Sequence, residues 1–123
     1  SIVRGTTSVK IVDMVRQAGA KEVHLYIASP PTTNPCFYGV DTPTKDKLLA
    51  SNMTLDEMAA HIGADSLKFI SIDGLYRAVG EDGRNNKIPQ YCDACFSGEY
   101  PTKLTDNNAP DDDKQFSLLM DNR

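Results

Sequence analysis

A helical pattern followed at once by an apolar strand pattern is the feature that most limits what this 123-residue chain can fold into. Residues 9–18 place their apolar side chains largely on one side of a helix, and Gly19 provides a stop. Residues 22–28, EVHLYIA, are rich in β-branched and aromatic residues, as expected of a strand buried on both faces. A helix leading into a buried strand predicts an α/β fold built on a parallel sheet.

The rest of the first 80 residues continues this alternation. A proline-rich stretch at 29–43 predicts a long ordered loop, of a length that is often functional. The elements expected after that loop are a short helix at 45–51 capped by Thr44, a helix from the capping box at 54–57 to residue 61 or 62, a strand at 66–71, and a helix at 73–80 with Leu75, Ala78 and Val79 facing inward.

The composition becomes polar near residue 81. The stretch EDGRNNKIPQ and the acidic tail with DDDK at 111–114 carry few apolar residues. We therefore expect residues 1–80 to form the α/β part and residues 81–123 an irregular, cysteine-containing extension with a draped or partly disordered tail. The DDDK run is interpreted as a solvated acidic patch.

Charge and hydropathy exclude several classes of protein. A formal net charge of −4 and a pI near 5.0 leave no basic excess for a general binder of nucleic acid or anionic membranes, so phosphate recognition must be local. The sequence has no apolar run of the roughly 18 residues that suggest a membrane span, and no leader pattern, which predicts a cytoplasmic protein. Three cysteines, an odd number, suit metal ligation or free thiols better than a secreted disulfide framework.

The stretch RGTTS near the N-terminus combines the features of an anion-binding loop at a helix start. Unpaired backbone N–H groups and the helix dipole favour an anion there, and the hydroxyls of Thr6, Thr7 and Ser8 add donors. Gly5 lets the backbone approach a ligand closely, and Arg4 adds positive charge. The simpler interpretation is a plain N-cap, because Thr and Ser are preferred caps of any helix.

The cysteines are spaced like metal ligands. Cys92 and Cys95, in CDAC, bring two thiolates within one turn, which suits a tetrahedral metal centre. Cys36, in the proline-rich loop, is the candidate third ligand, and three soft ligands without a nearby His leave a site one ligand short. Free thiols or a redox dithiol are the alternatives, although a thioredoxin-like CxxC follows a strand and opens a helix, a context that neither flank predicts here.

The N-terminal stretch SIVRGTTS resembles the second half of the ribose-phosphate loop of type I phosphoribosyltransferases, in which a strand ends in two acidic residues and a Gly-Thr-Thr turn follows. It is particularly similar to that of the amidophosphoribosyltransferases, the glutamine-dependent enzymes that open purine synthesis. The resemblance implies that Arg4, Gly5, Thr6, Thr7 and Ser8 surround the 5′-phosphate of phosphoribosyl pyrophosphate. It also implies an acidic pair, which holds the ribose hydroxyls, immediately before the first residue of this sequence.

Two further stretches resemble one branch of the same family. PCFYGVDTPT at 35–44 and CDACFSGEYPT at 92–102 are similar to segments that carry three of the four cysteine ligands of a four-iron four-sulfur (4Fe-4S) cluster in that branch. Cys36, Cys92 and Cys95 match those ligands one by one, and the resemblance puts the fourth ligand upstream of this sequence. Zinc or free thiols remain the alternative.

The resemblance covers residues 1–102 and implies a fold. It predicts the C-terminal part of a type I phosphoribosyltransferase domain, a Rossmann-like parallel sheet with flanking helices, followed by the cysteine-containing extension. The two histidines, His24 and His61, are assigned to structure. Asp41, in VDTP, either faces the active site or forms a turn.

The function implied by the resemblance is that of a pentosyltransferase and glutamine amidotransferase. The intact enzyme would transfer glutamine-derived ammonia to phosphoribosyl pyrophosphate with Mg²⁺, respond to purine nucleotides as feedback inhibitors, and form a homo-oligomer, a tetramer in the family. The 123 residues alone would be inactive and would contribute no catalytic residue. A non-catalytic metal-binding module and a phosphoribosyltransferase-like regulator that senses nucleotides are the alternative functions.

Overall fold

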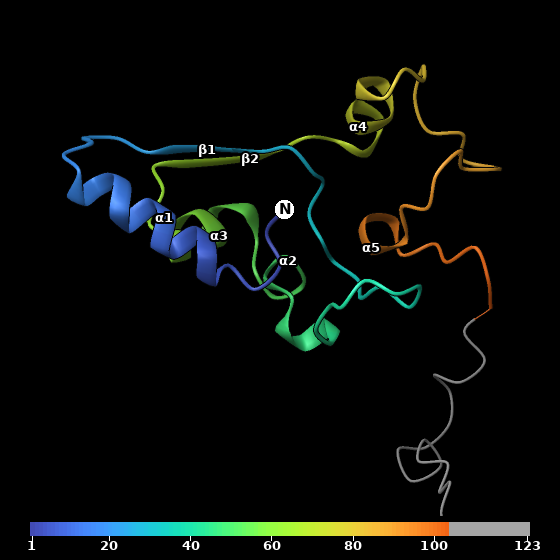
Figure 1. Cartoon of the computed structure of the whole chain (residues 1–123), viewed down its shortest axis with the longest axis horizontal. Coiled ribbons are helices and arrows are strands. Elements are labelled where there is room, and N and C mark those ends of the chain that lie inside the picture. The colour runs from blue at the N-terminus through green and yellow to red at the C-terminus, as the bar shows by residue number, and fades with distance from the viewer. Residues whose placement is uncertain (104–123) are drawn as a thin grey trace, which may run out of the picture.

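A computed structural model describes residues 1–103, and it confirms an α/β fold with a parallel sheet. The elements are α1 (Thr6–Gln17), β1 (His24–Ile27), the 3-10 helix η1 (Lys45–Lys47), α2 (Leu49–Asn52), α3 (Leu55–Ile62), β2 (Ser66–Phe69), α4 (Ile72–Ala78) and α5 (Ala94–Ser97). In Figure 1, α1 and α3 lie on one side of the two strands, and α4 and α5 lie beyond the ends of the strands. No helix among these residues is long and apolar enough to cross a bilayer.

The core lies between the sheet and the two helices on its covered face. Seven residues, drawn from the N-terminal segment, the helices, β2 and the position just before β1, form one buried apolar cluster: Ile2, Val12, Val23, Leu49, Met58, Ile62 and Leu67. The helix predicted at 9–18 starts earlier, at Thr6, and of its apolar side chains only Val12 is buried. Ile11 and Val15 remain 49% and 42% exposed, because α1 contacts the core along a narrow stripe.

The sheet is covered on one face only within the described residues. β1 and β2 pair in parallel from His24 opposite Ser66 to Ile27 opposite Phe69. Side chains alternate across a strand, so half of each strand faces away from the helices. Tyr26 on that outer face is 73% exposed. The expectation that residues 22–28 are buried on both faces is therefore wrong for this part of the chain.

Local capping signals decide where α3 begins and ends. The Thr54 hydroxyl accepts a hydrogen bond from the Glu57 amide at 3.3 Å, and Glu57 Oε2 accepts one from the Thr54 amide at 2.7 Å. This confirms the predicted capping box. Gly63, with a φ of 81°, ends the helix in the left-handed conformation that favours glycine.

The helix predicted at 45–51 is interrupted. Thr44 makes no side-chain capping bond, and the backbone is extended at Leu48 between η1 and α2. Leu48 is completely buried, so tertiary packing overrides helix continuity at this residue. The Asn52 side chain donates to the Leu48 carbonyl at 2.7 Å and stabilises the break.

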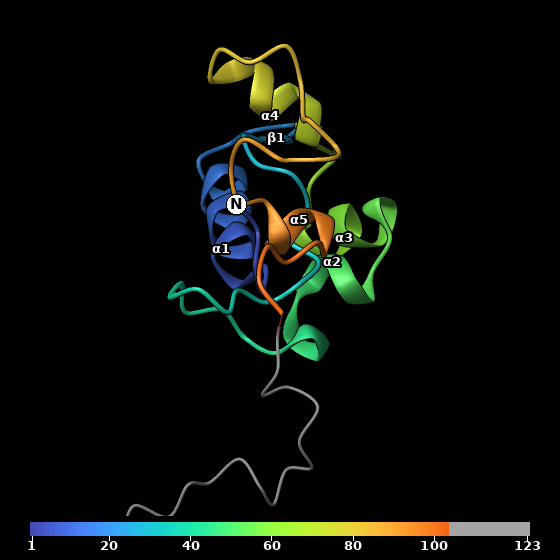
Figure 2. The same cartoon turned by 90° about the vertical axis from the view of Figure 1, so that its right-hand side faces the viewer.

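The last predicted helix has a different inward face from the one expected. α4 starts at Ile72, after the Ser71 hydroxyl accepts a hydrogen bond from the Gly74 amide at 2.9 Å. Of the predicted inward positions, Leu75 is half-buried, whereas Ala78 and Val79 are exposed, and Tyr76 is the buried residue. The physical reason is that α4 packs through Tyr76 against the C-terminal extension. Figure 2 shows that extension descending from α4 to α5.

Candidate functional site

The loop that precedes α1 requires glycine at its turn. Gly5 is the N-cap residue, with a φ of 83°, and is buried. A Cβ at this position would lie 2.8 Å from Leu49 Cδ2, so a larger residue would be both strained and too close. The N-cap makes no side-chain hydrogen bond, and Thr6, Thr7 and Ser8 lie inside the first turn. The plain Thr or Ser N-cap is therefore wrong as an explanation of this stretch.

The first turn of α1 presents hydrogen-bond donors that the protein itself does not use. Thr6 and Thr7 are exposed and Ser8 is half-buried. None of their hydroxyls makes a hydrogen bond to any part of residues 1–103. The first amides of a helix also lack intrahelical partners, and no acidic residue lies in this turn to compete for an anion. The arrangement suits an anionic ligand.

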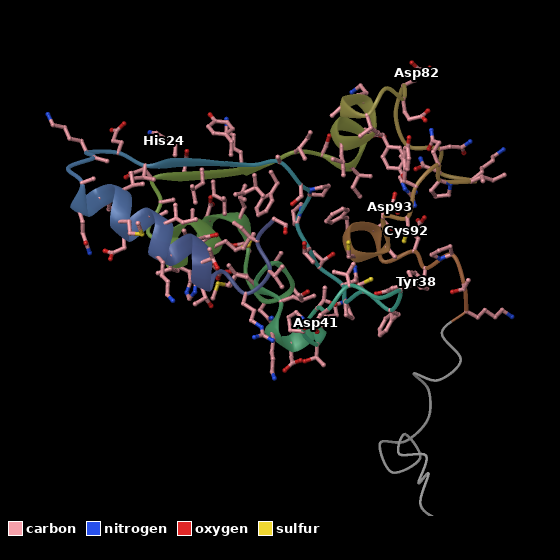
Figure 3. The ribbon with its side chains drawn as sticks, in the orientation of Figure 1. His24, Tyr38, Asp41, Asp82, Cys92 and Asp93 are labelled. Atoms are coloured by element: carbon pink, nitrogen blue, oxygen red, sulfur yellow. The ribbon has the colours of Figure 1, made fainter. Side chains whose placement is uncertain are left out.

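The same loop lines an open hollow of about 580 Å³. Ser1 to Ser8 form one wall, and Asp41 and Pro43 of the proline-rich loop form the other. The Leu49 amide donates to the Val3 carbonyl at 2.8 Å and connects this segment to α2. Asp41 is exposed and lies near the base of the α/β part in Figure 3. Asp41 therefore lines the same hollow as the RGTTS loop.

The proline-rich loop and the CDAC segment are joined through α5. The amides of Thr33 and Asn34 donate to the Cys95 carbonyl at 3.0 and 3.1 Å. The Thr33 hydroxyl donates to the Phe96 carbonyl at 3.3 Å. These bonds span more than 60 residues of sequence and bring the Cys36 loop against the Cys92–Cys95 turn.

Aromatic residues of the two cysteine stretches reinforce this junction. Tyr100 Oη donates to the Pro35 carbonyl at 2.6 Å, and its ring centroid lies 5.1 Å from that of Phe37 and 6.1 Å from that of Tyr38. Tyr38 Oη in turn accepts from the Thr102 amide at 3.3 Å. The PCFYG and YPT stretches thus contact one another directly, which gives their aromatic residues a structural role.

The three cysteines belong to one neighbourhood. Cys36 and Cys95 are partly buried and Cys92 is exposed, and Cys36 Sγ accepts a hydrogen bond from the Tyr38 amide at 3.4 Å. Burial raises the pKa of the Cys95 thiol, and negative charge on Cys36 and Cys92 raises the same pKa further. The bonds from Thr33 and Asn34 to the Cys95 carbonyl place the loop that carries Cys36 beside the turn that carries Cys92 and Cys95.

The cysteine neighbourhood can be tested against the metal groups that its chemistry suggests. Within residues 1–103, no three or more His, Cys, Asp or Glu side chains are grouped so that they could hold a single metal ion. Three thiols are a soft donor set, typical of zinc or iron–sulfur ligation. An iron–sulfur cluster is larger than one ion and accepts ligands that stand further apart. The donor type of the three thiols is therefore that of zinc or iron–sulfur ligation, although the described side chains are not grouped around a single ion.

Sequence reasoning missed the residue that organises the CDAC turn. Asp93, between the two cysteines, is 4% exposed and accepts hydrogen bonds from Arg84 Nε at 2.5 Å, Tyr76 Oη at 2.9 Å and Ser97 Oγ at 2.8 Å. Burial by itself would raise the pKa of Asp93, but these bonds outweigh burial and hold that pKa below its usual value. No periodic or spacing signal in the sequence links these side chains.

The remaining polar candidates lie away from both sites. His24 is exposed on the outer face of the sheet, with Nδ1 2.8 Å from Ser66 Oγ and Nε2 3.3 Å from Glu22 Oε2 (Figure 3). His61 lies in the last turn of α3. Their assignment to structure agrees with these positions. The DDDK run lies outside the described residues.

Comparison with characterised proteins finds relatives over almost the whole chain. The chain is 55% identical over 123 residues to the amidophosphoribosyltransferase of Rhizobium etli, a match that covers 99% of this chain and 25% of the relative. It is 51% identical over 104 residues to the amidophosphoribosyltransferase of Bacillus subtilis, which covers 85% of this chain and 22% of the relative. The chain belongs to the amidophosphoribosyltransferase family. It spans about a quarter of the length of these relatives, and no family profile matches it.

Solved structures of amidophosphoribosyltransferases have the same fold. The glutamine phosphoribosylpyrophosphate amidotransferase of B. subtilis, complexed with ADP and GMP, superposes with a TM-score of 0.75 at 50% identity and covers 85% of this chain and 23% of its own. A structure described as the allosteric regulatory enzyme of purine biosynthesis also gives 0.75, at 49% identity over 89% of this chain and 23% of its own. The Rossmann-like phosphoribosyltransferase fold expected from the sequence is confirmed.

Proposed function

We propose that this chain is part of an enzyme that transfers glutamine-derived ammonia to phosphoribosyl pyrophosphate and forms 5-phosphoribosylamine, pyrophosphate and glutamate. The observation that carries the proposal is the hollow beside the first turn of α1, where Thr6, Thr7 and Ser8 present unused donors. The identity of 55% to an amidophosphoribosyltransferase over the same residues supports it. The chain would then be the C-terminal portion of the phosphoribosyltransferase domain, inactive by itself.

In this proposal the RGTTS loop anchors the 5′-phosphate. The amides of the first turn and the hydroxyls of Thr6, Thr7 and Ser8 donate to phosphate oxygens, while Gly5 keeps the backbone close and Arg4 adds charge. Fixing the phosphate orients the C1 carbon of the ribose for attack by ammonia, so the chain contributes positioning rather than a nucleophile. Mg²⁺ carried by the substrate would stabilise the leaving pyrophosphate.

Asp41 extends the proposed site across the hollow from the phosphate loop. A carboxylate suits the hydroxyl or metal-bound side of a sugar phosphate, because it accepts hydrogen bonds and ligates Mg²⁺. We propose that Asp41 lies on the hydroxyl or metal-bound side of the substrate, because its carboxylate would repel the phosphate. The acidic pair expected before the first residue of this sequence would hold the ribose hydroxyls.

The cysteines are proposed to hold a 4Fe-4S cluster. Cys36, Cys92 and Cys95 would supply three thiolates, and a cysteine elsewhere in the polypeptide the fourth. The cluster would act structurally by joining the C-terminal extension to the rest of the domain. Loss of iron and sulfide on exposure to air should then accompany loss of activity.

Several wider properties follow from the same proposal. The related B. subtilis structure is complexed with ADP and GMP, which supports purine nucleotides as regulators of the present protein. We further propose a homo-oligomer in the cytoplasm. Nucleotide inhibition of the purified full-length protein and its mass in solution test these two points.

The decisive experiment replaces single hydroxyls of the phosphate loop in the full-length protein. Thr7→Val and Ser8→Ala should each raise the KM for phosphoribosyl pyrophosphate about tenfold, because a hydrogen bond to a charged group is lost. Ser66→Ala, which removes a hydroxyl bonded to His24 on the sheet, is the matched control and should change KM little. A wild-type protein that binds the substrate but forms no phosphoribosylamine would favour the nucleotide-sensing regulator. Zinc without iron or sulfide would favour the metal-binding module.

A further inference from the structure

The CDAC turn has little intrinsic stability. α5, which starts between the two cysteines, is only four residues long and has no side-chain cap. A helix of this length does not form by itself in water. Its conformation therefore depends on contacts made by the turn, and Asp93 makes most of these.

Asp93 holds the turn through both its backbone and its side chain. Its carbonyl accepts from the amides of Phe96 and Ser97, each at 2.9 Å. Its carboxylate accepts from Tyr76, Ser97 and two nitrogens of Arg84, at distances between 2.5 and 3.2 Å. One buried side chain thus connects α4, the loop after it and the cysteine turn (Figure 3).

Arg84 anchors the other end of this contact. Its side chain is 8% exposed, and besides Asp93 it contacts Glu99 through Nη2 and Asn86 Oδ1 through Nη1 at 3.1 Å. Its backbone amide donates to Asp73 Oδ1 of α4 at 2.9 Å. Arginine suits this position because its planar fork binds a carboxylate through two nitrogens at once, which lysine cannot do.

The charge of Arg84 also has a role next to the thiolates. A carboxylate between two cysteines adds negative charge where an anionic group is proposed to bind. The guanidinium compensates that charge and keeps the carboxylate in one orientation. A buried Asp93 without Arg84 would both lose this compensation and release the turn.

We infer that Arg84 is a positioning residue that acts through Asp93: the pair fixes the turn that carries Cys92 and Cys95, two of the proposed ligands of an iron–sulfur cluster. The inference rests on the proposed function. Residues that orient the ligands of a metal group typically change its affinity about 10–100-fold when they are replaced. The role concerns binding and retention of the cluster, not the transfer reaction.

The test uses the full-length protein purified without oxygen, with Arg84→Lys and Ser97→Ala as variants. Iron and acid-labile sulfide per chain, the rate at which the visible absorption bleaches in air, and the thermal midpoint are measured for each. We expect Arg84→Lys to bleach about tenfold faster than wild type. Ser97→Ala, which removes a single donor to Asp93, should also bleach faster than wild type, by a smaller factor. This second variant keeps the test valid if Arg84→Lys does not fold.

The matched control is Arg16→Lys. Arg16, in the last turn of α1, forms an Arg–Asp pair with Asp65: its Nη2 lies 2.8 Å from Asp65 Oδ2, and the two side chains are 37% and 39% exposed. Its replacement should leave the bleaching rate unchanged. If all variants lose thermal stability equally while iron, sulfide and bleaching stay at wild-type values, Arg84 is merely structural and the inference fails. If the wild-type protein holds no iron and sulfide, the proposed cluster fails and the inference fails with it.

Discussion

The two parts of the molecule are held together by different forces. In the α/β part, residues 1–80, seven apolar side chains form one buried cluster. In the described part of the extension, residues 81–103, the only buried apolar side chain is Ala94, and the other buried or nearly buried groups there are Asp93 and Arg84. The stabilisation from apolar burial depends on the buried area and not on orientation. The stabilisation from an ion pair and its hydrogen bonds depends on the distances and angles between the groups.

This difference predicts how each part responds to substitution. A core of interchangeable apolar residues tolerates substitutions of similar volume. A junction made of hydroxyls, carbonyls and aromatic rings depends on specific partners, because each substitution of a partner removes a hydrogen bond. The PCFYG and YPT stretches are such a junction. The α/β part should therefore respond to lost volume, and the extension to lost hydrogen bonds.

The largest effect should come from a cavity in the α/β part. Leu67→Ala removes a 4% exposed side chain from the centre of the core and should lower the free energy of unfolding by about 3 kcal/mol. Chemical denaturation of the chain measures this. Leu55→Ala, at a position that is 45% exposed, is the control and should cost about 1 kcal/mol or less. Equal losses for both variants would contradict the apolar-core description.

The next effect tests the extension by removing one hydroxyl. Tyr100→Phe keeps the ring but deletes the bond to the Pro35 carbonyl, and should destabilise the junction by about 1.5 kcal/mol. Faster hydrogen exchange at the amides of Thr33 and Asn34, which bond to Cys95, reports it locally. Tyr91→Phe is the control, because that hydroxyl makes no hydrogen bond within residues 1–103 and the residue is 52% exposed. Unchanged exchange in Tyr100→Phe would show that ring packing alone holds the junction.

A smaller effect is expected at the start of α3. Thr54→Ala removes the capping box and should cost about 1 kcal/mol in unfolding free energy. Thr44→Ala, at an N-cap without a side-chain capping bond, should cost less than half of that. Circular dichroism during denaturation measures both. Similar losses at the two threonines would mean that the observed bonds of Thr54 do not act as a cap.

The smallest effect is the response of the extension to acid. The pKa of Asp93 is lower in the folded chain than the value of about 3.9 expected when unfolded. The carboxylate therefore contributes stability that is fully present above the unfolded pKa and is lost as the pH falls through the folded pKa. Titration of the Asp93 carboxyl carbon by NMR should give a midpoint below 3.9. A midpoint above that value would mean that burial dominates over the bonds from Arg84, Ser97 and Tyr76.

The sequence by itself determined the features that depend on neighbours along the chain. The capping box at Thr54, the stop at Gly63 and the alternation of helix and strand all follow from spacing within a few residues, and each is present in the structure. The RGTTS and cysteine motifs also stand in the sequence. Their local chemistry was sufficient to predict a phosphate loop and a set of soft ligands.

Only the tertiary structure decided the features that depend on distant partners. The helix at 45–51 breaks because Leu48 is drawn into the interior, and α4 turns Tyr76 inward because Asp93 lies seventeen positions further along to receive its hydroxyl. The outer face of β1 is exposed because no described segment covers it. The periodicity of a sequence indicates which face of an element is apolar, but it does not indicate which carboxylate pairs with an arginine. The pair of Arg84 with Asp93, which fixes the cysteine turn, is therefore decided by the tertiary structure.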